Sequence, residues 1–384
     1  MGGISMAKVF KNVTIATGTE IITDGYIRFD DRVRAVGPMS DFHNEAGDEV
    51  TYAHGKVIVP GFIDVHCHGG YGYDTMDADP EKIDKMVRAT AYHEGVTSFF
   101  CTTITQSNEN IARAMVGVKQ AAKKNKVIQG IHLEGPFIDA EVKGAQPEKY
   151  ITQPDAALLD QWNDLAGGLV KIISFAPEND GARELEDYCI DHGIVPSVGH
   201  SMATRQDLLT SKVSHTCHLY NAQSPLSHRE PGVAGHTLLQ DEMYAELIMD
   251  GYHICPDMLQ LAYSIKGPEK IELITDSMRK KGLGDGVSEL GGQKVFVEGI
   301  HATLADGTIA GSVLPFITAF QNAMKFTTAG LYEAVLMSSV NQAREFGLTS
   351  KGGLQVGKDA DLNVLDADYN LLATYSYGEL VTAE

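Results

Sequence analysis

The sequence predicts a (β/α)₈ barrel with a small β-sandwich domain built from both chain ends, because of the rhythm of its apolar segments and their number. Beyond Pro60, short apolar runs alternate with longer helical patterns, which is typical of βα units around a parallel sheet. Eight is the strand number of this barrel. The eight strand-like runs are Phe62 to His66, Thr97 to Thr103, Val127 to His132, Val170 to Phe175, Ile194 to Val198, Val213 to His218, Ala245 to Met249 and Ile271 to Thr275.

Helical patterns fill the intervals between these runs. They include Pro80 to His93, Asn110 to Lys124, Ala182 to His192 and Pro256 to Ile265. After the eighth run, Gly291 to Gly311 predicts a β insertion, and Phe316 to Lys325 and Leu331 to Phe346 predict two further helices that close the barrel.

The two chain ends are predicted to share one small β domain. From Ala7 to about Val59 the chain reads as short alternating segments punctuated by Gly, Asp and Asn, and Gly357 to Leu365 returns to strand alternation. We expect these ends to pair, giving a domain of residues 1–59 and 350–384 beside a barrel domain of residues 60–349.

Composition limits the function classes. The chain has 384 residues with 51 acidic and 31 basic side chains, so its formal net charge is -20. That charge argues against nucleic acid or an anionic membrane as the partner. The five cysteines are odd in number and scattered, which fits a reducing cytoplasm better than a disulfide scaffold. We find neither a bilayer-spanning apolar stretch nor a signal-peptide pattern, and expect a cytoplasmic protein.

The first barrel strand ends in two histidines, His66 and His68. Residues two apart in a strand point the same way, so both imidazoles can offer a nitrogen to one cation. The spacing alone fits a structural pair of hydrogen-bonding histidines equally well.

Polar residues also follow four other predicted strands: Glu134, His200, His218 and Asp276. Active sites of these barrels lie at the carboxyl ends of the strands, and isolated buried polar groups cost several kcal/mol. Convergence on one rim therefore predicts a metal site. Judged alone, Asp276 reads as a helix N-cap, because Asp-Ser is good capping sequence.

Seven motifs carry a family resemblance that runs the full length of the chain. They are Pro-Gly-Phe-Ile-Asp-Val-His-Cys-His-Gly-Gly (60–70), His-Leu-Glu-Gly-Pro-Phe (132–137), Gly-His-Ser (199–201), Thr-Cys-His-Leu-Tyr-Asn-Ala (216–222), Arg-Glu-Pro-Gly (229–232), Asp-Gly-Tyr-His (250–253) and Thr-Asp-Ser (275–277). By these motifs the chain resembles the amidohydrolase superfamily and, within it, the family of N-acetylglucosamine-6-phosphate deacetylases. The resemblance implies hydrolysis of a phosphorylated amino sugar, N-acetylglucosamine 6-phosphate, to glucosamine 6-phosphate and acetate, in a homodimer.

The resemblance also implies roles for the polar residues. Glu134, His200 and His218 match the family's common metal site, and the retained His66 and His68 imply a second metal shared through Glu134. Asp276 matches the catalytic acid/base and a metal ligand. One or two divalent metals are expected, and histidine and carboxylate ligands suit Zn²⁺, Fe²⁺, Co²⁺ or Mn²⁺.

Four further residues are expected by resemblance to contact the substrate. Asn221, the Ala222 amide and Arg229 match a phosphate clamp, and His253 matches a contact to a sugar hydroxyl. A planar guanidinium suits phosphate because it donates two parallel hydrogen bonds. In isolation, Arg229 could instead pair with Glu230 on an exposed loop.

The chain departs from the family at Gln146, where many members have a histidine. A glutamine amide can donate a hydrogen bond to the substrate carbonyl but cannot become cationic. We therefore expect metal polarisation of the carbonyl to matter more here.

Other polar residues receive plainer interpretations. Cys67 and Cys217 are predicted to be small buried thiols, since each neighbours a ligand on the opposite face of a strand. His132 is expected either to bond a ligand or to coordinate. The basic trio from Arg279 to Lys281 is expected to be a solvated loop, with attraction of an anionic substrate as the alternative.

Three other functions compete with this one. The chemistry would be similar in a cyclic amidohydrolase of the dihydroorotase or hydantoinase kind, or in a deacetylase for an unphosphorylated sugar. A non-catalytic scaffold is the alternative from another class, because fold does not guarantee function.

Overall fold

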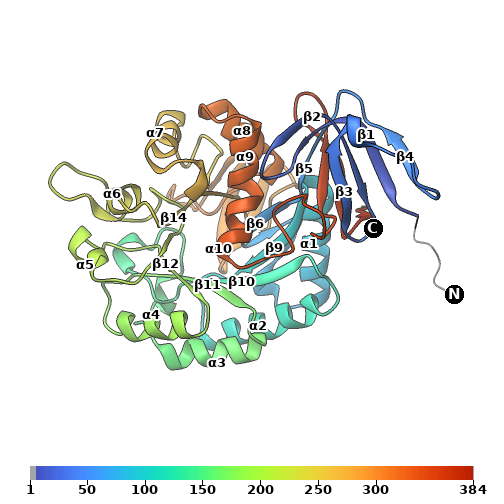
Figure 1. Cartoon of the computed structure of the whole chain (residues 1–384). Helices are drawn as coiled ribbons and strands as arrows, with labels where there is room; N and C mark the ends of the chain where they lie inside the picture. Colours follow the sequence, from blue (N-terminus) through green and yellow to red (C-terminus); the bar gives the residue numbers. More distant parts are fainter. Residues whose placement is uncertain (1–5, 384) are drawn as a thin grey trace.

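The computed structural model describes residues 6–383, so residues 1–5 and 384 of the predicted small domain lie outside the described residues. Eight parallel strands form the central sheet, which confirms the barrel (Figure 1). In spatial order they are β6 (Phe62–Cys67), β9 (Val96–Thr102), β10 (Ile128–Glu134), β11 (Val170–Phe175), β12 (Val195–Val198), β13 (His215–Thr216), β14 (Tyr244–Ile248) and β15 (Ile271–Ile274).

The barrel closes between its first and last strands. A parallel bridge joins Cys67 to Ser277, and the Asp276 amide donates to the His66 carbonyl at 2.8 Å. This closure brings the carboxyl ends of β6 and β15 side by side, which places their predicted site residues together.

Helices cover the outside of the barrel. They are α1 (Pro80–Glu94), α2 (Asn108–Ala122), α3 (Ala156–Ala166), α4 (Ala182–Asp191), α5 (Arg205–Leu209), α6 (Gly232–Leu239), α7 (Pro256–Lys266), α8 (Phe316–Phe326), α9 (Leu331–Val335) and α10 (Asn341–Glu345). Helix α1 shows why these segments are helical. Asp79 caps it by accepting from the amides of Glu81 and Lys82, Pro80 opens it, and Gly95 ends it at φ +80°. None of the described helices is long and apolar enough to cross a bilayer.

The expected helix over Leu331 to Phe346 is interrupted. A π-helical segment, Leu336–Val340, separates α9 from α10. Such bulges are local adjustments within helices and often lie at functional positions. Helix α10 contacts β6 and β15, and Glu345 at its end becomes important below.

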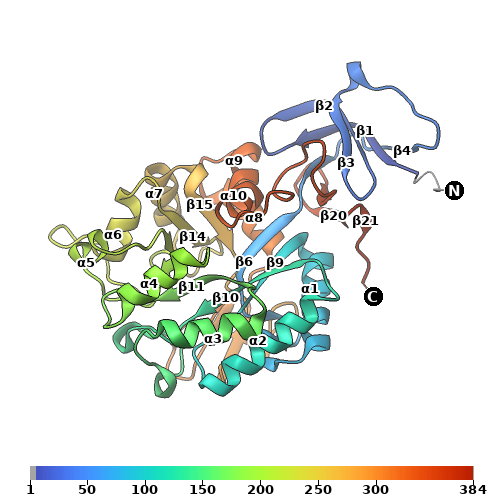
Figure 2. The same cartoon turned by 60° about the horizontal axis from the view of Figure 1, so that its bottom comes forward.

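The second sheet combines both ends of the chain, as predicted. Its order is β21 (Glu379–Leu380), β20 (Leu371–Ser376), β19 (Leu362–Leu365), β5 (Val57–Pro60), β1 (Lys8–Ala16), β2 (Ile21–Phe29) and β3 (Val33–Pro38), with β4 (Glu49–Tyr52) beside β1. Strand β5 pairs with β19 and continues through Gly61 into β6. The sheet lies beside the barrel in Figure 2 and has its own core around Phe10, Phe29 and Leu362. The residue limits of the two domains stay a prediction.

The β insertion after β15 begins earlier than Gly291. Three antiparallel strands, β16 (Gly286–Leu290), β17 (Gln293–Glu298) and β18 (His301–Thr303), form a small sheet. Its apolar face packs with Met278 and Ile104. Leu290 and the segment after β18 thereby reach the mouth of the barrel.

Candidate active site

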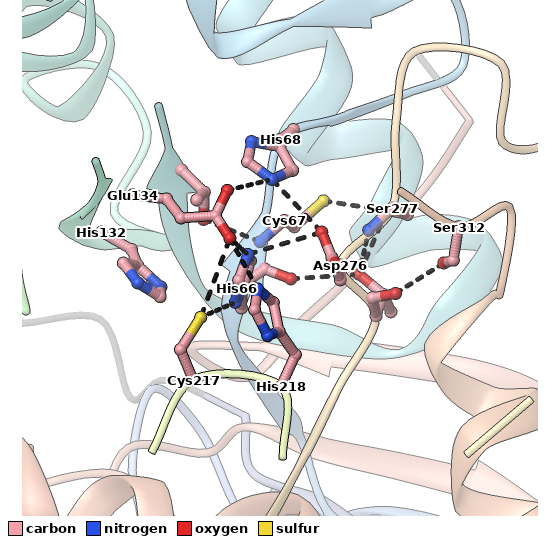
Figure 3. A network of polar contacts seen from close by, with 12 residues as sticks. His66, Cys67, His68, His132, Glu134, Cys217, His218, Asp276, Ser277 and Ser312 are labelled. Carbon is pink, nitrogen blue, oxygen red and sulfur yellow. Dashed lines mark hydrogen bonds and ion pairs between the residues drawn. The ribbon is translucent and has the colours of Figure 1, made fainter. Parts of the chain in front are cut away.

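Six predicted ligands from five strand ends converge at the carboxyl face of the barrel. Figure 3 shows five of them: His66, His68, Glu134, His218 and Asp276. Glu134 lies between four imidazoles. Its Oε1 is 2.9 Å from His218 Nε2 and 3.2 Å from His200 Nε2, while its Oε2 is 3.2 Å from His68 Nε2. On the other side, Asp276 Oδ1 lies 3.2 Å from His68 Nε2 and 3.4 Å from His66 Nε2. The sequence prediction that these six side chains meet therefore agrees with the geometry.

The backbone turns sharply where it presents these residues. His200, His218 and Asp276 all have positive φ values, of 48°, 28° and 46°. This region is costly for residues other than glycine and is often stored at functional sites. No helix begins at Asp276, so the N-cap interpretation is wrong.

A glycine sets the turn after Glu134. Gly135 has φ +70°, and a Cβ there would lie 2.2 Å from Thr105 Oγ1. Only glycine fits this close approach without a shift.

The donor set fits a divalent cation. Nitrogen and oxygen ligands of this kind suit Zn²⁺, Fe²⁺, Co²⁺ or Mn²⁺. His66 Nε2 is buried without a hydrogen-bond partner among the described residues, although it faces two carboxylates. The ring nitrogens His200 Nε2 and His218 Nε2 lie 3.2 Å apart, and both lie within 3.2 Å of Glu134 Oε1. Ligand groups that could hold metal include His66 with His68 and Asp276, and Glu134 with Cys217 and His218.

Both acidic ligands are held in their charged forms. Burial opposes ionisation of Glu134, but hydrogen bonds from His200 and His218 outweigh it and hold its pKa well below the usual range. Burial likewise opposes ionisation of Asp276, whose pKa is lowered by the charge of His66 and by a hydrogen bond from His68. Two buried carboxylates thus offer negative charge where the imidazoles converge.

A cavity of about 290 Å³ opens above this cluster. Four of the predicted substrate contacts line it: Gln146, Asn221, Ala222 and His253. Its apolar wall includes Ile104, Val142, Leu290 and Ile309. No lysine or arginine is among the described residues that line it.

The histidine among these contacts is held by a carboxylate. His253 Nδ1 lies 2.6 Å from Asp250 Oδ2. That contact leaves His253 Nε2 as the nitrogen that can serve a ligand.

Gln146 is bonded differently from the expectation. Its Nε2 donates to Glu134 Oε2 at 2.5 Å, and its Oε1 accepts from the Thr105 amide at 2.8 Å. The side chain is therefore fixed beside the metal-site carboxylate, and only one N–H remains for a substrate carbonyl.

Arg229 does not line the cavity. It is exposed, and its amide donates to Ser227 Oγ. Glu230 accepts from the amides of Arg205 and Gly232. The alternative pairing of Arg229 with Glu230 is not among the ion pairs of the described residues. Its phosphate role stays a prediction.

The expectation that Arg279 to Lys281 form a solvated loop is wrong. Lys281 is fully buried and forms an ion pair with Glu94 at 2.6 Å, and Arg279 pairs with Asp77 at 2.9 Å. These cations are already neutralised and are not a solvated loop. Cys67 is a buried thiol that contacts Ser277 Oγ at 3.1 Å, as expected.

Two residues near the site behave differently from expectation. Cys217 is buried, but its Sγ lies 3.6 Å from His66 Nδ1 and 3.7 Å from Glu134 Oε1, so it contacts the site directly. His132 binds Ser174 Oγ through Nε2 and the Val65 carbonyl through Nδ1. Both of its ring nitrogens have partners that are not predicted ligands, and its coordination of a metal stays a prediction.

The sequence analysis missed Glu246, which lies on β14 directly beneath the cluster. Its Oε2 is 2.9 Å from His66 Nδ1. A charged residue inside a strand of a barrel covered on both faces was the available signal.

Comparisons with known proteins show the family of this chain. The model of the amidohydrolase family matches residues 57–381. N-acetylglucosamine-6-phosphate deacetylase of Bacillus subtilis (strain 168) is 41% identical over 387 residues, covering 97% of this chain and 96% of the relative. N-acetylgalactosamine-6-phosphate deacetylase of Escherichia coli O157:H7 is 32% identical, covering 87% of this chain and 90% of the relative.

A solved structure matches equally broadly. An aspartate-to-alanine mutant of N-acetyl-D-glucosamine-6-phosphate deacetylase from Mycobacterium smegmatis, in complex with N-acetyl-D-glucosamine 6-phosphate, superposes with a TM-score of 0.92 at 31% identity. The match covers 98% of this chain and 99% of that chain. With its barrel, its converging ligands and these full-length matches, the chain belongs to the amidohydrolase family.

Proposed function

We propose that this protein hydrolyses the acetamide of N-acetylglucosamine 6-phosphate to glucosamine 6-phosphate and acetate, in amino-sugar catabolism. The observation that carries the proposal is the full-length match at 41% identity to a deacetylase of that name. The converging ligands beneath a cavity of suitable polarity support the same chemistry.

The metal would be held by the six converging side chains. Glu134, His200 and His218 form one proposed site, and His66 and His68 with Asp276 form a second that shares Glu134. When bound, a divalent cation supplies positive charge that polarises the amide carbonyl and acidifies water toward a pKa of about 7. We propose Zn²⁺ or Fe²⁺ as the resident ion, with Co²⁺ or Mn²⁺ as substitutes.

Asp276 performs the proton transfers in this proposal. As a buried carboxylate held in its charged form, it can take the proton of the attacking water. After the C–N bond breaks, the same carboxyl group returns the proton to the departing amine. Gln146 keeps Glu134 in place through its 2.5 Å hydrogen bond and has one N–H left for the carbonyl oxygen.

Asn221, the Ala222 amide and Arg229 are the proposed phosphate contacts, and His253 is the proposed contact to a sugar hydroxyl. Arg229 is needed because the described lining of the cavity offers no other cation. Arg229 lies in an exposed segment. A cytoplasmic location is proposed from the five free cysteines.

Replacing Arg229 by Ala tests the substrate. A charged hydrogen bond to phosphate contributes about 1.5–3 kcal/mol, so kcat/KM for the phosphorylated sugar should fall roughly 10- to 150-fold. Acetate release should be measured with N-acetylglucosamine 6-phosphate, with the sugar lacking phosphate, and with N-acetylgalactosamine 6-phosphate. The exposed Arg113→Ala variant is the control.

Equal turnover of phosphorylated and unphosphorylated sugar would contradict the phosphate assignment. A preference for N-acetylgalactosamine 6-phosphate would indicate that the substrate is the one in the name of the Escherichia coli relative. Hydrolysis of a cyclic amide but of neither sugar would favour the dihydroorotase kind.

Removing the metal should abolish turnover. Prolonged dialysis against a chelator should yield apoprotein that releases no acetate, and added Zn²⁺ or Co²⁺ should restore the rate, because the carbonyl and the water both depend on the cation. Metal content per chain should be measured alongside activity. Protein that holds well under one metal per chain and cannot be reconstituted would favour the non-catalytic scaffold.

A further inference from the structure

Glu246 connects two of the six predicted ligands. Its side chain is fully buried on β14. One oxygen, Oε2, lies 2.9 Å from His66 Nδ1 and also accepts the backbone N–H of His218 at 2.9 Å. Because His66 ends β6 and His218 follows β13, a single carboxylate oxygen holds ligands from two different strands.

The contacts continue away from the site toward the other end of the barrel. Glu246 Oε1 lies 3.2 Å from His215 Nε2, at the start of β13. His215 Nδ1 lies 3.0 Å from Glu345 Oε2, at the end of α10. The result is an alternating row of imidazole and carboxylate, His66–Glu246–His215–Glu345, whose side chains are at most 6% exposed.

Burying this row of ionisable side chains costs free energy, which suggests that the row has a role. Interiors of these barrels are usually filled by branched apolar side chains, and unpaired buried ionisable groups cost several kcal/mol. Here imidazole and carboxylate alternate, because Glu246 has an imidazole on each side and His215 has a carboxylate on each side. The alternation offsets part of the free energy that burial costs. It also makes the orientation of each side chain depend on its neighbour in the row.

We propose that Glu246, His215 and Glu345 are positioning residues for the metal ligand His66. Glu246 accepts a hydrogen bond from His66 Nδ1–H and so fixes the tautomer whose Nε2 carries no proton. His66 Nε2 is the nitrogen that faces Glu134 and Asp276. His215 orients Glu246 across 3.2 Å, and Glu345 orients His215 across 3.0 Å. The inference rests on the proposed function, since it requires a metal at His66.

The barrel floor offers a matched control. Glu272 on β15 is fully buried, and one of its oxygens lies within 4.8 Å of ligand atoms of His215 and Glu345. Burial and the charge of Glu345 raise the pKa of Glu272 well above its usual range. Glu272 is not in contact with Glu246 or His66 among the ion pairs and hydrogen bonds of the described residues. Glu272→Gln therefore changes a neighbouring buried carboxyl on the barrel floor without changing the side chain that contacts His66.

The experiment compares Glu246→Gln, His215→Gln and Glu345→Gln with Glu272→Gln in the full chain. Affinity for Co²⁺ should be measured by competition with a chromophoric chelator, together with the visible Co²⁺ spectrum, the melting temperature of the apoprotein, and kcat and KM. A His66→Asn variant identifies the part of the spectrum that reports the His66 site. Loss of a carboxylate behind a metal-bound histidine typically weakens affinity roughly 10- to 100-fold, so we expect that loss in Glu246→Gln.

His215→Gln and Glu345→Gln should also lower the affinity for Co²⁺ and weaken the same part of the visible Co²⁺ spectrum. Glu272→Gln should match the unmodified protein in affinity and spectrum. Unchanged affinity and spectrum in Glu246→Gln would overturn the proposal, as would an equal loss in Glu272→Gln, which would indicate general packing of the floor.

Three further results are decisive in other ways. If Glu246→Gln does not fold, His215→Gln and Glu345→Gln decide the proposal by the same criterion. If the unmodified protein binds no metal, the proposed function itself fails. If it binds metal and every variant binds equally, only the positioning role fails.

Discussion

Replacing Asp276 by Asn should lower kcat for acetate release roughly 10²- to 10⁴-fold, the usual contribution of a general acid/base. Asparagine has nearly the same size but cannot take a proton from water or return one to the amine. Asp276 Oδ1 is shared by His66 and His68, so some loss of metal at that site is also expected.

Kinetics and metal analysis on one preparation separate the two effects of this substitution. Metal at the site of Glu134, His200 and His218 should be retained while kcat falls and KM changes little. The exposed Asp285→Asn variant makes the same chemical change outside the cavity lining and serves as the control. A variant at Asp276 that keeps more than about a tenth of kcat would remove this residue from proton transfer.

Replacing Glu134 by Gln should lower activity about as strongly as replacing Asp276, because the variant should bind the metal less well. Glu134 contacts His68, His200 and His218 within 3.2 Å, so its charge serves both proposed metal positions. If the cation supplies about 4 kcal/mol of transition-state stabilisation, its loss lowers kcat/KM roughly 10³-fold. Metal content should fall together with activity.

The control for this substitution is Glu141→Gln, the same chemical change on an exposed residue of a loop beside the cavity. Added Co²⁺ at high concentration should restore part of the activity of the Glu134 variant. Full metal content with unchanged kinetics would show that Glu134 is not a ligand.

Much of the barrel was predictable because its strands are mostly apolar. Val170–Phe175 was predicted to the residue, and the other strands were within a few residues, because these runs are buried on both faces. The strand at Val213 to His218 is the exception, since only His215–Thr216 pairs as a strand. Polar residues on both sides of Thr216 leave the apolar signal too weak to set its bounds.

The ligands were predictable from position, whereas their supports were not. His66, Glu134 and Asp276 follow apolar runs, so each stands out at a strand end. Glu246 and Glu272 sit inside short runs, where a charged residue resembles the solvent-facing half of an alternating strand. Only closure of the barrel shows that both point inward.

Residues whose roles depend on partners far along the chain were the hardest to predict. Lys281 looks like part of an exposed basic loop until its pairing with Glu94 is seen. Arg229 has the right chemistry for phosphate, but one sequence does not say where its loop lies. Both depend on long-range packing, which local patterns do not encode.

The join between β5 and β6 has a consequence for how the protein matures. The strand that bears His66 and His68 continues from β5, and β5 is flanked by β1 and by β19, which is translated only near the end of the chain. A nascent chain that stops before Leu362 therefore leaves one edge of β5 without its partner strand. His66 and His68 are therefore synthesised early. The strand that carries them gains its last partner, β19, only after Leu362–Leu365 has been translated.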